Sequence, residues 1–130
     1  MMKNAIIRIP GVKMTGLPFS HIVKAGDILY LTSQLSCDLQ SGLIIPGDVA
    51  TQTRKAMENI KYLLSNAGSS MEHVLRVHVY MRNVSEFGEM NRVYREYFRE
   101  GEEPARVAVQ APSPIEGIDI EIEVTATTEG

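Results

Sequence analysis

The chain has 130 residues, 44% of them hydrophobic, and 13 basic and 16 acidic residues give it a formal net charge of −3. This length supports one hydrophobic core and is too short for two, so we expect a single domain over residues 1–130. The charges are spread along the chain, so the clustered Lys and Arg that bind a nucleic-acid backbone are missing and nucleic-acid binding is not expected.

The cysteine and histidine content excludes several further classes. Cys37 is the only cysteine, so no disulfide forms within the chain, and no Cys/His cluster has zinc-ligand spacing. The histidines lack ligand spacing as well, so no metal is expected. No apolar run approaches the roughly 20 residues of a membrane span, and no signal peptide is apparent. We therefore expect a cytoplasmic protein that does not enter the membrane.

The first half of the chain predicts three strands and a helix. Three β-rich runs cover residues 5–9, 21–24 and 28–32, and a Gly26-Asp27 turn joins the last two into a hairpin. After a loop over 37–47, Asp48 is placed to cap a helix. Its apolar residues recur with the 3.6-residue period of one buried stripe, and Gly68 ends it; the stripe is Val49, Ala56, Met57, Ile60, Leu63, Leu64 and Ala67.

The second half predicts a strand, a helix and two strands. Residues 74–81 alternate as a half-buried strand, and Ser85 is expected to cap a helix. Strands are expected over 105–110 and 118–127, separated by a loop with two prolines. The helix stripe is Phe87, Met90, Tyr94, Tyr97 and Phe98. The order βββ-α-β-α-ββ predicts an α+β fold, with two helices packed on one face of a mixed sheet.

The final strand also predicts a surface for association. Its odd-numbered positions carry Asp119, Glu121, Glu123 and Thr125, and its even-numbered positions are apolar. If both helices cover the apolar face, the opposite face of the sheet is left for solvent or for another subunit. We expect an oligomer, and these residues alone do not fix the number of subunits.

Two charged residues are the first candidates for chemistry. Arg106 follows Pro104-Ala105, and Glu121 lies on a regular strand about one hairpin later. Such a pair can hold an anionic substrate and place a water beside it. The residues alone leave other interpretations open: Arg106 in a salt bridge with Glu103 or Glu121, and Glu121 as one of several solvated carboxylates, which is the default for this pattern.

Several motifs follow one another in the order and approximate spacing of a known family. They are Leu17-Pro18-Phe19-Ser20-His21, Leu29-Tyr-Leu-Thr-Ser-Gln34, the helix that ends Asn66-Ala67-Gly68, the segment from Phe87 to Phe98, Pro104-Ala105-Arg106, and Ile120-Glu121-Ile122-Glu123. From about Ile6 to Ala126 the chain resembles the Rid proteins, the reactive-intermediate deaminases also called the YjgF-like or liver perchloric-acid-soluble protein family.

The resemblance implies a chorismate-mutase-like sandwich, assembled as a homotrimer with clefts between subunits. It also implies hydrolysis of 2-aminoacrylate, 2-aminocrotonate and the corresponding imines to 2-keto acids and ammonia. The expected ligands are therefore small 2-imino and 2-keto acids, and the resemblance implies no metal or organic cofactor.

The resemblance also assigns roles to residues. Arg106 would grip the substrate carboxylate through two parallel hydrogen bonds. Glu121 would polarise the attacking water or pass protons to the departing ammonia. Asn91 would line the cleft, although a core amide satisfied by nearby backbone is comparably plausible from the residues alone.

Three positions depart from the family pattern. Phe19 stands where the best-characterised deaminases have tyrosine, Ser33 where they have glycine, and Ala108 where many have cysteine. These residues would form the substrate-binding wall together with Arg106 and Asn91, so the changes leave the substrate preference open.

Two alternative functions stay open. Relatives in this family are also ascribed a single-strand ribonuclease or translation-inhibitor activity, which the acidic balance disfavours. A non-catalytic module that binds small carboxylates, or a chaperone-like protein, would use the same cleft. A nucleophilic triad is not supported, because Ser33, Ser36 and Cys37 have no histidine partner nearby in the sequence.

Overall fold

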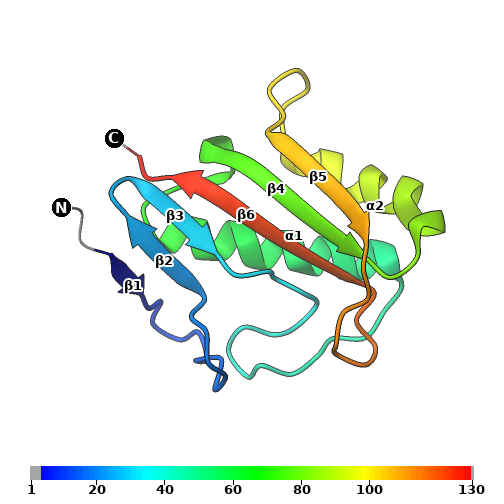
Figure 1. Cartoon of the computed structure of the whole chain (residues 1–130), viewed down its shortest axis with the longest axis horizontal. Helices are drawn as coiled ribbons and strands as arrows, with labels where there is room; N and C mark the ends of the chain where they lie inside the picture. The colour runs from blue at the N-terminus through cyan, green and yellow to red at the C-terminus, as the bar shows by residue number, and fades with distance from the viewer. Residues whose placement is uncertain (1–3, 130) are drawn as a thin grey trace.

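The computed structural model describes residues 4–129 and shows one sheet with two α-helices behind it (Figure 1). In chain order the elements are β1 (Ala5–Ile7), β2 (Ile22–Ala25), β3 (Ile28–Leu31), α1 (Val49–Asn66), the short 3₁₀ turn η1 (Met71–His73), β4 (Val74–Met81), η2 (Val84–Glu86), α2 (Phe87–Tyr94), η3 (Arg95–Tyr97), β5 (Ala105–Gln110) and β6 (Ile120–Thr127). This order is the predicted βββ-α-β-α-ββ.

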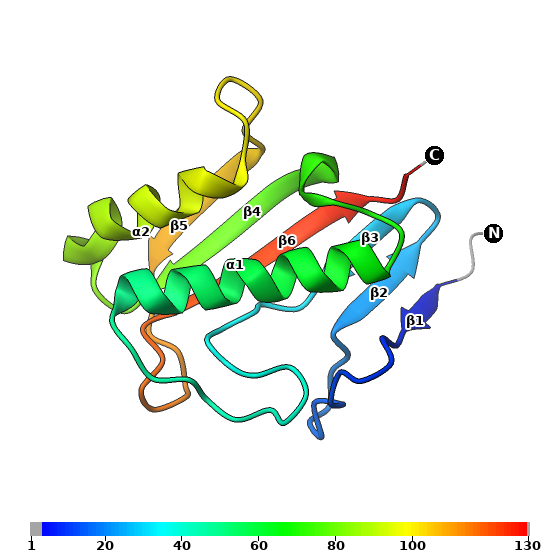
Figure 2. The ribbon, with the colours of Figure 1, turned by 180° about the vertical axis from the view of Figure 1, so that it is seen from behind.

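The six strands form one mixed sheet in the order β1-β2-β3-β6-β4-β5. Only β4 and β5 pair in parallel, and the other neighbours are antiparallel. Both α-helices lie on the same face of this sheet, which Figure 2 shows from behind. The predicted α+β architecture is therefore confirmed, and none of the helices in residues 4–129 lies on the opposite face of the sheet.

Three local signals in the sequence act as predicted. The β2–β3 hairpin closes around Gly26, whose φ of 59° lies in the left-handed region that glycine adopts at little cost. Helix α1 begins where the Asp48 carboxylate accepts a hydrogen bond of 2.8 Å from the backbone N–H of Thr51. Gly68, with φ of 81°, follows its end.

The core lies between the helices and the apolar face of the sheet. The even-numbered residues of β6 face it and are buried, as are the matching residues of β4 and the apolar stripe of α1. The odd-numbered residues of β6 face the other way and are half-buried. The alternation predicted for this strand thus separates an apolar interior from a polar face.

Three predicted boundaries are wrong. Ser85 does not cap α2: it lies within η2, and the helix begins at Phe87 with no side-chain cap. The N–H of Phe87, which a cap at Ser85 would serve, bonds instead to the Val84 carbonyl of η2. Helix α2 also ends at Tyr94, and β6 begins at Ile120, because the N–H of Ile118 still bonds back to Ile115 within a turn.

Within residues 4–129, no helix is both long enough and apolar enough to span a membrane.

Candidate functional site

The two residues first proposed for chemistry lie on opposite faces of the sheet. Arg106 is the register partner of Val77, whose buried side chain faces the helices. Glu121 is the register partner of Tyr80, on the face without helices. Because register partners point to the same side of a sheet, one copy of the chain does not place Arg106 and Glu121 in one pocket.

Arg106 is held by side chains of α2. Its Nη1 donates a hydrogen bond of 2.6 Å to Asn91 Oδ1, and its guanidinium carbon lies 4.8 Å from the ring centre of Tyr94 and 5.4 Å from that of Phe87. These are cation–π distances, and they fix the plane of the guanidinium. The half-buried Asn91 amide is thus satisfied by a side chain and not by nearby backbone.

The arginine opens onto a pocket of about 590 Å³, lined also by Phe98, Pro104 and the carboxylates of Glu100 and Glu103. Arg106 forms no ion pair within 4.0 Å with any residue in the part of the chain that the structure describes, so the alternative of a salt bridge with Glu103 or Glu121 is not realised in one copy. An exposed guanidinium that is oriented but not neutralised can accept an anionic ligand.

Tyr94 is a site residue that the sequence reasoning assigned only to the core. Burial raises the pKa of its hydroxyl to about 12, although the nearby Arg106 acts in the opposite direction. The phenol therefore stays neutral and offers Arg106 an aromatic face. The spacing of Phe87, Asn91 and Tyr94 on one helix face was the available signal, and it was interpreted as a buried stripe.

Glu121 sits in a second pocket, on the face without helices. Ser33 Oγ donates a hydrogen bond of 2.6 Å to Glu121 Oε1, so this carboxylate is held in place and is not simply solvated. The pocket has a volume of about 370 Å³ and is also lined by Thr32, Tyr80 and the loop 111–114. A fixed carboxylate on the wall of an open pocket can orient a water molecule and exchange protons with it.

The neighbouring Glu123 has a different partner. The Tyr80 hydroxyl donates a hydrogen bond of 2.7 Å to Glu123 Oε1, and this bond, with burial as a second cause, raises the pKa of Tyr80 above its usual value. The two carboxylates of β6 are thus distinguished by their donors, Ser33 for Glu121 and Tyr80 for Glu123.

Of the remaining predicted residues, Phe19 lies near the Ser33–Glu121 pair and Ala108 does not. Phe19 is 49% exposed and lines a third, largely apolar pocket that also reaches Ser33. Ala108 lies two residues beyond Arg106 on the helix side of β5, where it packs against the core. The structure therefore brings together Arg106 with Asn91, and Ser33 with Glu121 and Phe19, as two separate groups.

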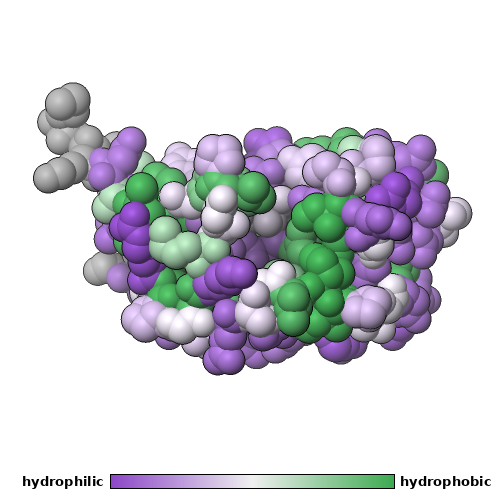
Figure 3. Space-filling view, turned by 90° about the horizontal axis from the view of Figure 1, so that it is seen from below, coloured by the Kyte–Doolittle hydropathy of each residue, from purple (hydrophilic) through white to green (hydrophobic). Residues whose placement is uncertain are grey.

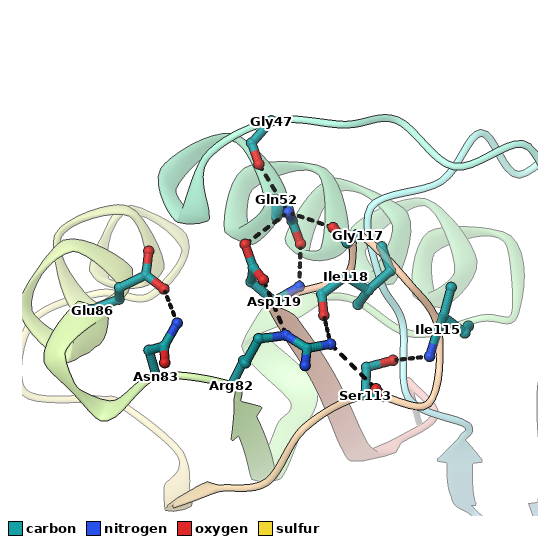
Figure 4. A network of polar contacts seen from close by, with 10 residues as sticks. All are labelled: Gly47, Gln52, Arg82, Asn83, Glu86, Ser113, Ile115, Gly117, Ile118 and Asp119. Atoms are coloured by element: carbon teal, nitrogen blue, oxygen red, sulfur yellow. Dashed lines mark hydrogen bonds and ion pairs between the residues drawn. The ribbon is translucent and has the colours of Figure 1, made fainter.

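A buried glutamine that the sequence reasoning did not single out anchors the loop beside Glu121 (Figure 4). Gln52, in the first turns of α1, is 1% exposed. Its Nε2 donates to the carbonyls of Gly47 at 2.9 Å and Gly117 at 3.1 Å, and its Oε1 accepts from the Asp119 N–H at 2.8 Å. The start of α1 is thereby bonded to the chain just before β6.

Arg82 holds the same loop from the other side (Figure 4). Its Nη2 donates to the carbonyls of Ile118 at 3.1 Å and Ser113 at 3.3 Å, and its Nε lies 3.3 Å from Asp119 Oδ1. Ser113 belongs to the wall of the Glu121 pocket. Arg82, Gln52 and Asp119 therefore position that wall without lining the pocket themselves.

Over residues 4–129, no group of three or more His, Cys, Asp or Glu side chains is arranged to hold a metal ion.

Comparison with known proteins places this geometry in a family. Residues 13–128 match the family model described as endoribonuclease L-PSP. The chain is 41% identical to a RutC family protein of Pyrococcus horikoshii, over 98% of this chain and all of that protein. It is 38% identical to the 3-aminoacrylate deaminase RutC of Acinetobacter baylyi, over 84% of this chain and 86% of that protein.

Two further comparisons agree. The chain is 32% identical to the 2-iminobutanoate/2-iminopropanoate deaminase of Mus musculus, over 84% of this chain and 80% of that protein. The crystal structure of RidA from an Antarctic Psychrobacter species superimposes with a TM-score of 0.85 at 28% identity, covering 95% of this chain and 98% of that one. The chain therefore belongs to the Rid family, the group whose model is described as endoribonuclease L-PSP.

Proposed function

We propose that this chain hydrolyses 2-imino acids and their enamine tautomers, of the 2-aminoacrylate type, to 2-keto acids and ammonia. The observation that carries the proposal is the state of Arg106, a guanidinium oriented by Asn91 and two aromatic rings and not neutralised by any described carboxylate. A relative named as a 2-iminobutanoate/2-iminopropanoate deaminase supports this chemistry, and one named as a 3-aminoacrylate deaminase supports deamination of a related enamine acid. A planar guanidinium binds a substrate carboxylate in two-point fashion.

The reaction needs Glu121 beside the same substrate, and the geometry then requires a second copy of the chain. Arg106 and Glu121 occupy opposite faces of the sheet, so the substrate would lie between Arg106 of one subunit and Glu121 of its neighbour. The face without helices exposes Tyr30, Val107 and Val109, at 51%, 38% and 43%, which favours burial against a neighbour. We propose a homotrimer with one such shared site at each interface.

The proposed chemistry uses Glu121 as a proton shuttle. The water oxygen adds to C2 of the imine, and Glu121 takes a proton from the water and passes it to the nitrogen, giving a carbinolamine. Glu121 then moves the hydroxyl proton to the amino group, the C–N bond breaks with its electron pair on nitrogen, and ammonia leaves a 2-keto acid. Ser33 holds one oxygen of Glu121 throughout, which leaves the other oxygen for the water.

The decisive experiment generates 2-aminoacrylate in place with a serine dehydratase and follows the release of pyruvate and ammonia. The chain should accelerate release, and Arg106→Ala should remove the acceleration while far-ultraviolet circular dichroism stays unchanged. An unaltered rate with the wild-type chain would exclude the deaminase. Calorimetric binding of a 2-keto acid that Arg106→Ala abolishes, without hydrolysis of any imine, would instead indicate a carboxylate-binding module.

The proposed assembly has its own test. Sedimentation equilibrium should give a mass three times the 14.4 kDa of one chain. A charge placed on the open face by Val109→Glu should shift the mass toward that of one chain, because the like-charged face of Glu121 and Glu123 would meet it. A wild-type monomer at assay concentrations would contradict the shared site.

A further inference from the structure

A fourth pocket, of about 400 Å³, lies against α1, and the proposed reaction does not use it. Its other walls are residues 11–12, which follow β1, and residues 38–40, in the loop before α1. It shares no lining residue with the Arg106 pocket or with the Glu121 pocket. Figure 3 looks onto the loop end of the molecule, where apolar and polar surface lie side by side. The pocket against α1 is therefore separate from the groups assigned to imine hydrolysis.

Four residues of α1 line this pocket at the spacing of one helix face. Positions i, i+3, i+4 and i+7 of that face are Lys55, Glu58, Asn59 and Tyr62. The Glu58 carboxylate already accepts a hydrogen bond of 2.6 Å from the Tyr97 hydroxyl. Lys55 forms no ion pair within 4.0 Å with any residue from 4 to 129. The Lys55 ammonium is thus the charged group of this helix face that is left for a ligand.

Asn59 is the buried polar residue of the pocket, at 2% exposure. Its Nδ2 donates to the carbonyls of Leu35 at 3.1 Å and Cys37 at 3.0 Å, and its Oδ1 accepts no hydrogen bond within the described chain. Among the side-chain atoms of residues 4–129, the Nδ1 of His21 alone is both sealed from solvent and without a partner. The Asn59 Oδ1 is therefore open to the pocket, and an amide oxygen in a buried side chain needs a donor.

The loop before α1 supplies a carboxylate to the same pocket. Asp38 Oδ2 accepts hydrogen bonds from the Ser41 hydroxyl at 2.7 Å and from the Ser41 N–H at 3.2 Å. These bonds lower the pKa of Asp38, so its carboxyl group is ionised at neutral pH. Because Ser41 uses Oδ2 for both bonds, the other oxygen, Oδ1, is left for a ligand. The pocket thus offers two acceptor oxygens, on Asp38 and Asn59, and one cation.

We propose that this pocket binds a free α-amino acid as its zwitterion, with the ammonium group on the oxygens of Asn59 and Asp38 and the carboxylate on Lys55. An ammonium group donates three hydrogen bonds and accepts none, which suits two acceptor oxygens. A carboxylate suits a lysine that no described carboxylate pairs with, because a charge-assisted bond is stronger than a neutral one. The site does not depend on the proposed deaminase reaction, since it uses neither Arg106 nor Glu121.

The rest of the lining indicates the side chain of the amino acid. Val12, Leu39 and the ring of Tyr62 form the apolar part of the pocket wall. Tyr62 is 46% exposed, so a ligand can cover its ring. Apolar walls around a few polar groups favour a ligand with an apolar substituent. We therefore expect leucine to bind more tightly than glycine or aspartate.

The test is calorimetry with the 130-residue chain and L-leucine, beside two analogues that each lack one charge. 4-Methylpentanoate keeps the carboxylate and lacks the ammonium group, and leucinamide keeps the ammonium group and lacks the carboxylate. L-Leucine should bind with a Kd of about 1 mM or tighter. Each analogue should bind about 10-fold more weakly or worse. No saturable binding of L-leucine up to about 10 mM, or equal binding of all three compounds, would overturn the proposal.

Matched variants locate the bound amino acid. Lys55→Gln should weaken leucine binding about 10-fold, because it removes the partner of the carboxylate. Lys61→Gln is the control, since Lys61 is exposed on the same helix and does not line the pocket, and it should leave the Kd unchanged. Arg106→Ala should also leave it unchanged. Leucine binding that Arg106→Ala abolishes and Lys55→Gln retains would assign the amino acid to the Arg106 pocket and contradict the proposal.

Discussion

The two faces of the sheet hold their charged side chains in different surroundings. On the helix side, the Arg106 cation rests on aromatic rings and an amide, and no carboxylate neutralises it within the described chain. On the other side, the carboxylates of Glu121 and Glu123 each accept a hydroxyl hydrogen bond. Each face carries one of the two groups that the proposed imine hydrolysis would use, so that proposal requires a second copy of the chain.

The largest effect on activity is expected from a substitution of Glu121, on the face without helices. Glu121→Gln keeps an oxygen for the Ser33 hydroxyl but cannot take a proton, so kcat should fall by about 10²- to 10⁴-fold with a much smaller change in KM. Steady-state kinetics on an imine substrate measures both. Glu123→Gln is the matched control on the same strand, and equal losses in the two variants would remove the distinction between their donors.

A substitution of Arg106, on the helix side, should mainly weaken substrate binding. Arg106→Lys keeps the charge but loses the two-point geometry and the stacking on Tyr94 and Phe87, so kcat/KM should fall by about 10- to 100-fold, mainly through KM. Arg92→Lys, on the exposed side of the helix that carries Phe87 and Tyr94, should leave both constants unchanged. A substitution at Arg106 that lowers only kcat would argue against a role in gripping the carboxylate.

Mixing the two kinds of variant chain tests whether Arg106 and Glu121 of different subunits form one site. Arg106→Ala and Glu121→Gln chains, unfolded together and refolded in equal amounts, should recover about a quarter of wild-type activity, because random assembly gives that share of intact shared sites. The separately refolded variants provide the baseline. No recovery from a mixture that forms mixed oligomers would indicate that one chain supplies both residues.

The loop that precedes β6, which Gln52 bonds to the start of α1, should contribute to stability. Gln52→Ala removes a buried side chain that bonds the Asp119 N–H and the Gly117 carbonyl, which should lower the free energy of unfolding by about 2 kcal/mol. Urea denaturation measures the change. Gln40→Ala removes an exposed glutamine and should have little effect. A loss no larger than that control would show that the network does not anchor the loop.

The smallest effect is expected at the cap of α1. The hydrogen bond from the Thr51 N–H lowers the pKa of Asp48 below its usual 3.8, so the cap stabilises the fold above that pH and the stabilisation is lost as the pH falls through the folded-state pKa. Asp48→Ala should lower the melting temperature by a few degrees at pH 7, and the difference from wild type should shrink below pH 3.8. A difference that grows in acid would contradict this assignment.

Much of the fold follows from local patterns. The alternation in residues 74–81 and the 3.6-residue period after Asp48 depend on neighbours in the sequence, and both elements appear where they were predicted. Ser85 fails as a cap because the 3₁₀ turn η2 comes first: the Phe87 N–H bonds to the Val84 carbonyl, and the Val84 N–H at the start of this turn bonds to the side chain of Gln110 on β5. A cap signal in the sequence cannot reveal such competition.

The candidate site was predictable as residues and not as an arrangement. The face of β5 that Arg106 occupies depends on its register with β4, which no pattern in residues 105–110 fixes. Gln52 and Asp119 are 67 residues apart, and their bond appears only once the chain is folded. The spacing of Tyr94 places it on the apolar face of α2. Residues of a buried stripe and residues that stack on Arg106 recur with the same period, so the spacing does not distinguish them.

The place of β6 in the sheet has a consequence for biosynthesis. This strand follows all the others along the described chain, yet it lies between β3 and β4, so it joins two halves of the sheet that have no other pairing (Figure 1). A nascent chain on the ribosome can form the β1–β3 hairpins and the β4–β5 pair early, but these stay separate until residues 120–127 emerge. Glu121 lies on the strand that completes the sheet, so the proposed activity would require the whole sheet to have formed.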